Sequence, residues 1–150
     1  TIVLNGGING GINGGTIGGI TGDTTGDDQI AAHLAHVDGV MLGRHAYHEP
    51  WSMAAWDQRF LGAEAPAAHT IDEVEARFVD YVARRPWPAG ASWLAATRHM
   101  MGLRNGQPGA RRWRQVWSDA RLRHESPVQV MALARAAMQG QAQHNETVAA

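Results

Sequence analysis

Residues 98–114 read RHMMGLRNGQPGARRWR, and this stretch decides how the second half of the chain folds. Its central segment, NGQPG at 105–109, places two glycines and a proline between two helical patterns. Glycine adopts backbone conformations that other residues avoid, and proline disrupts the interior of a helix. The stretch therefore predicts a turn at 105–109 that separates two helices.

A further helix is expected ahead of this stretch, over about 70–84. Thr70 and Glu73 have the spacing of a capping box, in which side chains bond the free backbone N–H groups at the helix start. An apolar stripe with helical spacing follows, made of Ile71, Val74, Phe78 and Val82. The run RPWP at 85–88 should end this helix, because proline lacks a backbone donor.

The remainder of the chain predicts three more helices, over about 92–103, 110–122 and 126–140. Ser92 and Ser126 are suitable N-cap residues, and Pro127 suits the first turn of the last helix. We expect residues 141–150 to form a frayed tail.

The first part of the chain alternates strand and helix. Residues 1–4 are a short apolar β run that stops at Asn5-Gly6-Gly7. Residues 28–36 are compatible with a helix, and residues 39–42 predict a buried strand that ends at Gly43-Arg44. This order is typical of parallel strands joined by a helix.

A Gly-rich segment at 9–28 interrupts that order, since ten of the 18 glycines lie in residues 1–26. Glycine loses much backbone entropy on folding and packs no side chain, so a flexible or irregular loop is favoured over a helix or strand. A repetitive β-solenoid turn is the alternative, although two or three short NGGI-like repeats are too few to stack.

Beyond the second strand, residues 45–56 predict a short helix or turn that Pro50 interrupts. Residues 57–69 include a glycine and a proline and predict a linker. The expected organisation is an α/β segment at 1–56, this linker, and a helical domain at 70–140.

Both strands end in residues that suit phosphate binding. Asn5-Gly6-Gly7 presents backbone N–H groups with no Cβ in the way. At Gly43-Arg44 the glycine again leaves space, and the arginine offers a forked, permanently charged donor. Each pattern is also common in ordinary turns, so the hypothesis depends on their order. In (β/α)8 barrels the phosphate commonly lies at the loops after strands 7 and 8, and the order here fits those last two units.

The charge of the chain is unevenly distributed, although the net charge is only −1. Residues 1–43 hold four aspartates and no arginine, whereas residues 98–135 hold eight arginines against Asp119 and Glu125. Such asymmetry indicates a polyanionic partner for the second half of the chain.

A helix over 109–121 would separate these charges from the core. One face would be apolar, made of Trp113, Val116, Trp117 and Ala120. The opposite face would be rich in arginine, made of Arg111, Arg114, Ser118 and Arg121. Arg98, His99 and Arg104 on the preceding helix could extend the basic surface. The alternative interpretation is a solvated face with surface ion pairs.

Three segments together resemble the C-terminal part of the tRNA-dihydrouridine synthases, closest to their A subfamily: residues 98–114, VDGVMLGR at 37–44 and LNGGI at 4–8. The resemblance implies an α/β fold made of the last strands of a (β/α)8 TIM barrel followed by a C-terminal helical bundle domain. It also implies an oxidoreductase that reduces uridine in tRNA to 5,6-dihydrouridine. In that family hydride passes from NADPH to FMN and then to the uracil C5–C6 bond.

The resemblance also assigns binding roles. The residues implied at the FMN phosphate are Asn5, Gly6, Gly7, Gly43 and Arg44. The residues implied at tRNA are Arg111 and Arg114, and their neighbours Arg98 and His99 extend that set. Residues 70–140 would then be the tRNA-binding domain.

Two departures from the family stand out. The family places one ordinary helix between NGGI and the DGVMLGR strand, whereas residues 9–36 here are longer and largely Gly-rich. The family also uses a cysteine to supply the proton, and this chain has none. We therefore expect a fragment with no catalytic residue and no synthase activity by itself.

Two other hypotheses remain open from the sequence. A non-catalytic RNA-binding helical module with a disordered Gly-rich leader would bind tRNA without flavin. Another FMN barrel that acts on a small molecule would not bind RNA.

Composition excludes several kinds of functional site. Without cysteine there is no disulfide, thiolate metal site or cysteine nucleophile in the chain. Two pairs of histidines lie close together in the sequence, His33 with His36 and His45 with His48. Neither pair has the further ligands and spacing of a metal site, so no metal is expected. No apolar run approaches the roughly 20 residues of a membrane span. We expect a cytoplasmic monomer.

Overall fold

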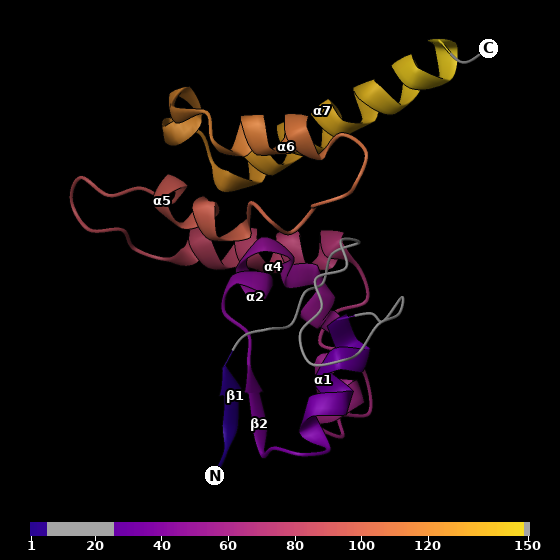
Figure 1. Cartoon of the computed structure of the whole chain (residues 1–150). Helices are drawn as coiled ribbons and strands as arrows, with labels where there is room; N and C mark the ends of the chain where they lie inside the picture. The colour runs from indigo at the N-terminus through magenta and orange to yellow at the C-terminus, as the bar shows by residue number, and fades with distance from the viewer. Residues whose placement is uncertain (6–25, 149–150) are drawn as a thin grey trace. The chain divides into compact units, whose positions relative to one another are not determined.

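The structure of the chain, a computed structural model, describes residues 1–5 and 26–148 (Figure 1). It divides into two compact units, Thr1–Pro66 and Ala67–Ala150, called here the N-terminal and C-terminal units. The predicted phosphate-loop residues Gly6 and Gly7, and most of the Gly-rich segment, lie outside the described residues. None of the helices in the described part of the chain combines the length and apolar character needed to cross a bilayer.

The N-terminal unit is built on two parallel strands, β1 (Val3–Asn5) and β2 (Gly39–Met41), with α1 (Gly26–Leu34) between them in the sequence. Val3 pairs with Gly39 and Asn5 with Met41, so both strands end at the same edge. The prediction of these elements is confirmed, but the prediction that the second strand is buried is wrong. Met41 is 44% exposed, because a sheet of two strands has little around it to cover its faces.

Three short helices follow β2, namely α2 (Arg44–His48), the 3₁₀ helix η1 (Pro50–Ala55) and α3 (Trp56–Phe60). Pro50 separates the first two, as the sequence indicated. α3 occupies the start of the segment expected to be a linker. Asp27 of α1 accepts hydrogen bonds from Trp56 Nε1 at 2.8 Å and from Arg59 at 2.9 Å, which fastens α3 to α1.

The C-terminal unit consists of helices, namely α4 (Ile71–Arg84), α5 (Leu94–Thr97), η2 (Arg98–Met100), α6 (Ala110–Trp117), η3 (Ala120–His124) and α7 (Pro127–Val148). Both α4 and α6 pack against α7. Local signals fix the helix starts. Thr70 Oγ1 accepts from the Glu73 N–H at 3.1 Å, and Ser126 Oγ accepts from the Gln129 N–H at 3.2 Å.

Helix lengths depart from the sequence prediction in three places. The helix expected over 92–103 is shorter, since η2 ends at Met100. α6 ends at Trp117, because the Asp119 carboxylate bonds the Arg121 N–H and begins η3 instead. α7 passes Gly140 and continues to Val148, where a frayed tail was expected. A single glycine costs a helix only about 1 kcal/mol, which a long helix tolerates.

The buried side of α4 differs from the apolar stripe predicted for it. Ile71, Val79 and Val82 are buried, whereas Val74 and Phe78 of the predicted stripe are only half-buried. The fourth buried residue of the helix is a glutamate, Glu75, whose exposed fraction is 0%. A buried carboxylate requires partners for its charge and its lone pairs.

Glu75 finds four such partners on three other segments. Its Oε1 atom accepts hydrogen bonds from the indole N–H groups of Trp113 at 2.6 Å and Trp117 at 3.1 Å. Its Oε2 atom accepts from Arg104 at 2.7 Å and from Arg135 at 2.9 Å. The carboxylate therefore joins α4 to the turn before α6, to α6 itself and to α7.

A second carboxylate supports the same arginines from the surface. Arg104 also donates to Asp72 Oδ1, and Arg135 donates to the Asp72 backbone carbonyl at 2.9 Å. The hydrogen bond from Arg104 lowers the pKa of the Asp72 carboxyl, and the charges of Arg104 and Arg135 act in the same direction. This contribution to stability is present above the ordinary pKa of 3.8 and is lost as pH falls through the lowered value.

We predict that Glu75→Gln destabilises the protein by about 3–5 kcal/mol, because it leaves Arg104 and Arg135 without their shared buried counter-charge. Asp80→Asn is the matched control, since Asp80 lies on the same helix in an exposed pair with Arg84. Its loss should cost less than about 0.5 kcal/mol. Urea unfolding followed by tryptophan fluorescence measures both. Equal losses would show that the buried network contributes no more than a surface pair.

Candidate functional site

The first candidate site is the edge where β1 and β2 end. Asn5 and Met41 are paired there, so β1 and β2 end at the same edge, and Gly43-Arg44 follows shortly after the end of β2. Gly43 has φ −93°, which any residue can adopt. Within residues 1–5 and 26–148, a Cβ added there would meet only Met41 Sδ, at 3.9 Å. The residues that the structure describes therefore leave space beside Gly43, as the approach of a phosphate group requires.

Arg44 begins α2 and is exposed at this edge. It forms no ion pair with any carboxylate in residues 1–5 and 26–148. The other arginine of this unit, Arg59, is held by Asp27 and Asp28, each at 2.9 Å. Arg44 is thus the arginine of the N-terminal unit with charge available for an anion. The side chain of Asn5 lies outside the described residues.

The histidines near this edge pack locally. His45 Nε2 lies 3.0 Å from Ser52 Oγ, and the His45 ring stacks on Trp56 with centroids 6.5 Å apart. Over the described part of the chain, no three His, Cys, Asp or Glu side chains gather into a group that could hold a metal ion.

The second candidate site is the surface of α6. The helix begins at Ala110, directly after its N-cap residue Gly109, which has φ +77° in the left-handed region. A Cβ at this position would lie 2.9 Å from Met138 Cα of α7. Glycine is therefore required twice, for its backbone conformation and for the close approach of α7. The turn predicted at 105–109 is confirmed.

The two faces of α6 follow the sequence prediction in part. Trp113 and Trp117 are fully buried, and their rings meet edge to face with centroids 6.4 Å apart. Ala120, predicted on the same face, is exposed because it belongs to η3 rather than α6. Arg111 is exposed on the other side.

The four residues predicted to bind tRNA differ in their surroundings. Arg111 is exposed and pairs with no carboxylate that the structure describes. Arg114 is half-buried and donates to Asn105 Oδ1 at 2.8 Å, which anchors the preceding turn. Arg98 and His99 are both exposed on η2, where Arg98 Nε donates to His99 Nε2 at 3.1 Å.

One arginine expected on this surface is not there. Arg104 is only 6% exposed, and its charge is taken by Glu75 and Asp72. The Arg104 guanidinium also lies over the Trp113 ring, 5.6 Å from its centroid. The expectation that Arg104 extends the basic surface is therefore wrong, because Arg104 binds the buried carboxylate of Glu75 and does not face solvent.

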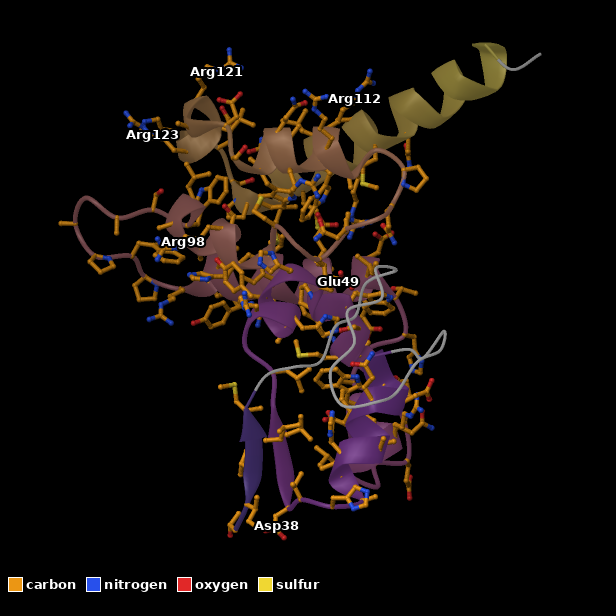
Figure 2. The ribbon with its side chains drawn as sticks, viewed as in Figure 1. Asp38, Glu49, Arg98, Arg112, Arg121 and Arg123 are labelled. Atoms are coloured by element: carbon orange, nitrogen blue, oxygen red, sulfur yellow. The ribbon has the colours of Figure 1, made fainter. Side chains whose placement is uncertain are left out.

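Arg112 and Arg123 are also exposed here, and the sequence analysis did not single them out. Figure 2 shows Arg112, Arg121 and Arg123 extending from the ribbon of α6 and η3. The charge of Arg121 is balanced by Asp119. The hydrogen bonds that Arg121 donates lower the pKa of Asp119 to about 2. Arg123 and His124 lie beside each other at the end of η3. The closely spaced basic residues of ARLRH, at 120–124, are the sequence signal that could have found them.

Comparison with known proteins identifies the family of the chain. The family model described as dihydrouridine synthase (Dus) matches residues 17–142, which span both units. This chain belongs to the dihydrouridine synthase family.

Individual relatives of this dihydrouridine synthase chain are similar across the same region. A tRNA-dihydrouridine(20/20a) synthase from Pseudomonas putida is 36% identical over 139 residues, covering 93% of this chain and 36% of the relative. The Pseudomonas syringae protein of the same name is 37% identical over 144 residues, with the same two coverages. The Salmonella typhimurium protein is 41% identical over 92 residues, covering 61% of this chain and 27% of the relative. The chain thus spans about a third of the length of the first two relatives.

We predict that Gly109→Ala destabilises this dihydrouridine synthase chain by more than Gly106→Ala. Gly106 has nearly the same backbone, φ +76°, but no atom lies within 4 Å of its Cβ position. Gly106→Ala should therefore cost only the left-handed conformation, about 1–2 kcal/mol. Gly109→Ala should add about 1–3 kcal/mol for the contact with Met138. Thermal unfolding measures the stability of both variants. Equal losses of stability would mean that α7 does not approach Gly109 this closely.

Proposed function

We propose that the whole protein to which this chain belongs is a tRNA-dihydrouridine synthase, which reduces uridine in tRNA to 5,6-dihydrouridine. The family match across residues 17–142 carries the proposal. The names of the relatives support positions 20 and 20a of tRNA as the uridines that it reduces. The exposed arginines of the C-terminal unit are consistent with a polyanionic substrate.

In this proposal the two units have separate tasks. The N-terminal unit contributes the last strands of a (β/α)8 barrel, consistent with its parallel β1 and β2. The C-terminal unit is the helical tRNA-binding domain. The family match includes both, so an RNA-binding module without the synthase fold is not favoured.

The proposed cofactors are FMN and, as the reductant, NADPH. When bound, FMN supplies the hydride for the uracil C5–C6 bond. Gly43, Arg44 and the Asn5-Gly6-Gly7 loop would hold its phosphate group. Among the described residues, no atom other than Met41 Sδ approaches the Cβ position of Gly43 and no carboxylate pairs with Arg44, and both features suit a phosphate. The residues around the flavin ring, and the cysteine that supplies the proton, would belong to parts of the protein beyond this chain.

On the tRNA side, Arg111 is the member of the predicted set best suited to contact phosphate, because it is exposed and pairs with no carboxylate among the side chains that the structure describes. Arg114 has a local partner in Asn105, so its first role is to hold the turn before α6. Arg98 and His99 would add contacts from η2.

The activity is tested by expressing the whole protein in a bacterial strain whose own dihydrouridine synthases are deleted, and then mapping dihydrouridine along its tRNA. We expect the modification to return at positions 20 and 20a. Its absence from every position would overturn the proposed function. Its return only at other positions would keep the activity and overturn the assignment of the uridines.

The phosphate site is tested by FMN affinity. We predict that Arg44→Gln in the whole protein weakens FMN binding about 10- to 100-fold, the equivalent of one lost charge-assisted hydrogen bond. Arg59→Gln removes the same charge from the same unit, but Arg59 is already paired with Asp27 and Asp28. Fluorescence titration of the apoprotein with FMN measures both. Equal affinities in the two variants would remove Arg44 from the site.

A further inference from the structure

An open groove runs between α5 and η3 in the C-terminal unit, with a volume of about 700 Å³. One wall is the segment 90–92 with Leu94 and Ala95 of α5, and the other is Ala120, Arg123 and His124 of η3. The volume falls within the roughly 300–1,000 Å³ of small-molecule sites. It is large enough for one nucleotide and much larger than an inorganic anion.

The walls of the groove are fastened to each other beneath it. Trp93 is 7% exposed, and its indole N–H donates to the Glu125 carbonyl at 3.1 Å, directly after η3. The Trp93 ring also meets Trp117 edge to face, with centroids 5.9 Å apart. The Thr97 hydroxyl at the end of α5 lies between two carbonyl acceptors, Leu94 at 2.8 Å and Trp117 at 3.3 Å. The groove is therefore formed before any ligand arrives, which reduces the entropic cost of binding.

The charge of the groove is positive. Arg123 Nε donates to His124 Nε2 at 2.9 Å, which leaves the two terminal guanidinium nitrogens for another acceptor. Arg123 pairs with no carboxylate of the described residues, and neither Asp nor Glu is among the groove's lining residues. Arg121 of the same helix differs, because Asp119 binds it at 2.7 Å. The groove thus combines an apolar wall of short side chains with an uncompensated guanidinium.

We propose that this groove binds one unpaired nucleotide of the tRNA, with its phosphate at Arg123 and His124 and its base along the wall formed by Ala91, Leu94 and Ala95. Arginine binds phosphate through two N–H groups and stacks on unpaired bases, so one residue serves both parts of a nucleotide. This inference rests on the proposed function and adds to it a contact separate from Arg111 on α6.

The test measures the steady-state kinetics of the whole, flavin-loaded protein with tRNA. Arg123→Ala should raise KM for tRNA about 10-fold or more, the effect of one lost charge-assisted contact, with kcat changed less than about twofold. Arg121→Ala is the matched control, because it removes the same charge from the same helix but outside the groove. It should raise KM less than about threefold, through the general electrostatic attraction alone.

A second variant fills the groove without changing charge. Ala95 is exposed, so Ala95→Phe should fold normally, which thermal unfolding verifies, and should also raise KM for tRNA about 10-fold by occupying the place of the base. Equal effects of Arg123→Ala and Arg121→Ala, or an unchanged KM in Ala95→Phe, would overturn the inference.

The two proposals fail in different ways. If the unaltered protein forms no dihydrouridine, the proposed function fails, and fluorescence anisotropy with labelled tRNA then tests the groove directly on the same variants. If the unaltered protein is active and all variants bind tRNA equally, only the groove is excluded. The second result would leave an acidic protein partner as the ligand to examine next.

Discussion

The C-terminal unit depends on the hydrogen bonds and ion pairs of one buried carboxylate, that of Glu75. It lies on α4 and binds residues from the turn before α6, from α6 and from α7, at separations of 29 to 60 positions along the chain. A carboxylate with no exposure is stable only when its charge is balanced and both oxygens are bonded. The four hydrogen bonds together satisfy this requirement, and they favour the arrangement of helices that brings all four partners to Glu75.

This arrangement also decides which charges face solvent. Because both indoles of α6 point to Glu75, Arg111 and Arg112 on its other side are exposed. Arg104 is drawn into the core, and Arg121 is compensated by Asp119. The positive charge available to a polyanion is therefore smaller than the eight arginines of residues 98–135 suggest. Among the residues that the structure describes, arginines without a carboxylate partner lie on α6 and at the end of η3, where we propose contacts with tRNA.

The N-terminal unit is organised by its backbone rather than by a buried charge. Parallel pairing brings the ends of β1 and β2 to one edge, and Gly43-Arg44 follows directly from β2. Arg59 is paired with Asp27 and Asp28, whereas Arg44 pairs with no carboxylate in the described part of the chain. The proposed cofactor site and the proposed RNA surface thus depend on the same distinction, between arginines that the fold has already paired and arginines that it leaves for a phosphate group.

The sequence by itself determined what depends on neighbouring residues. The caps at Thr70 and Ser126, the break at Pro50, the turn before Gly109 and the inward face of Trp113 and Trp117 all follow from short-range spacing and backbone preference. It also indicated the family through its motifs. Tertiary structure alone decided that Glu75 is buried, that Arg104 is internal and that a basic groove forms beside Arg123. Glutamate and arginine are ordinarily exposed, and their burial becomes favourable only when partners distant in the chain meet them.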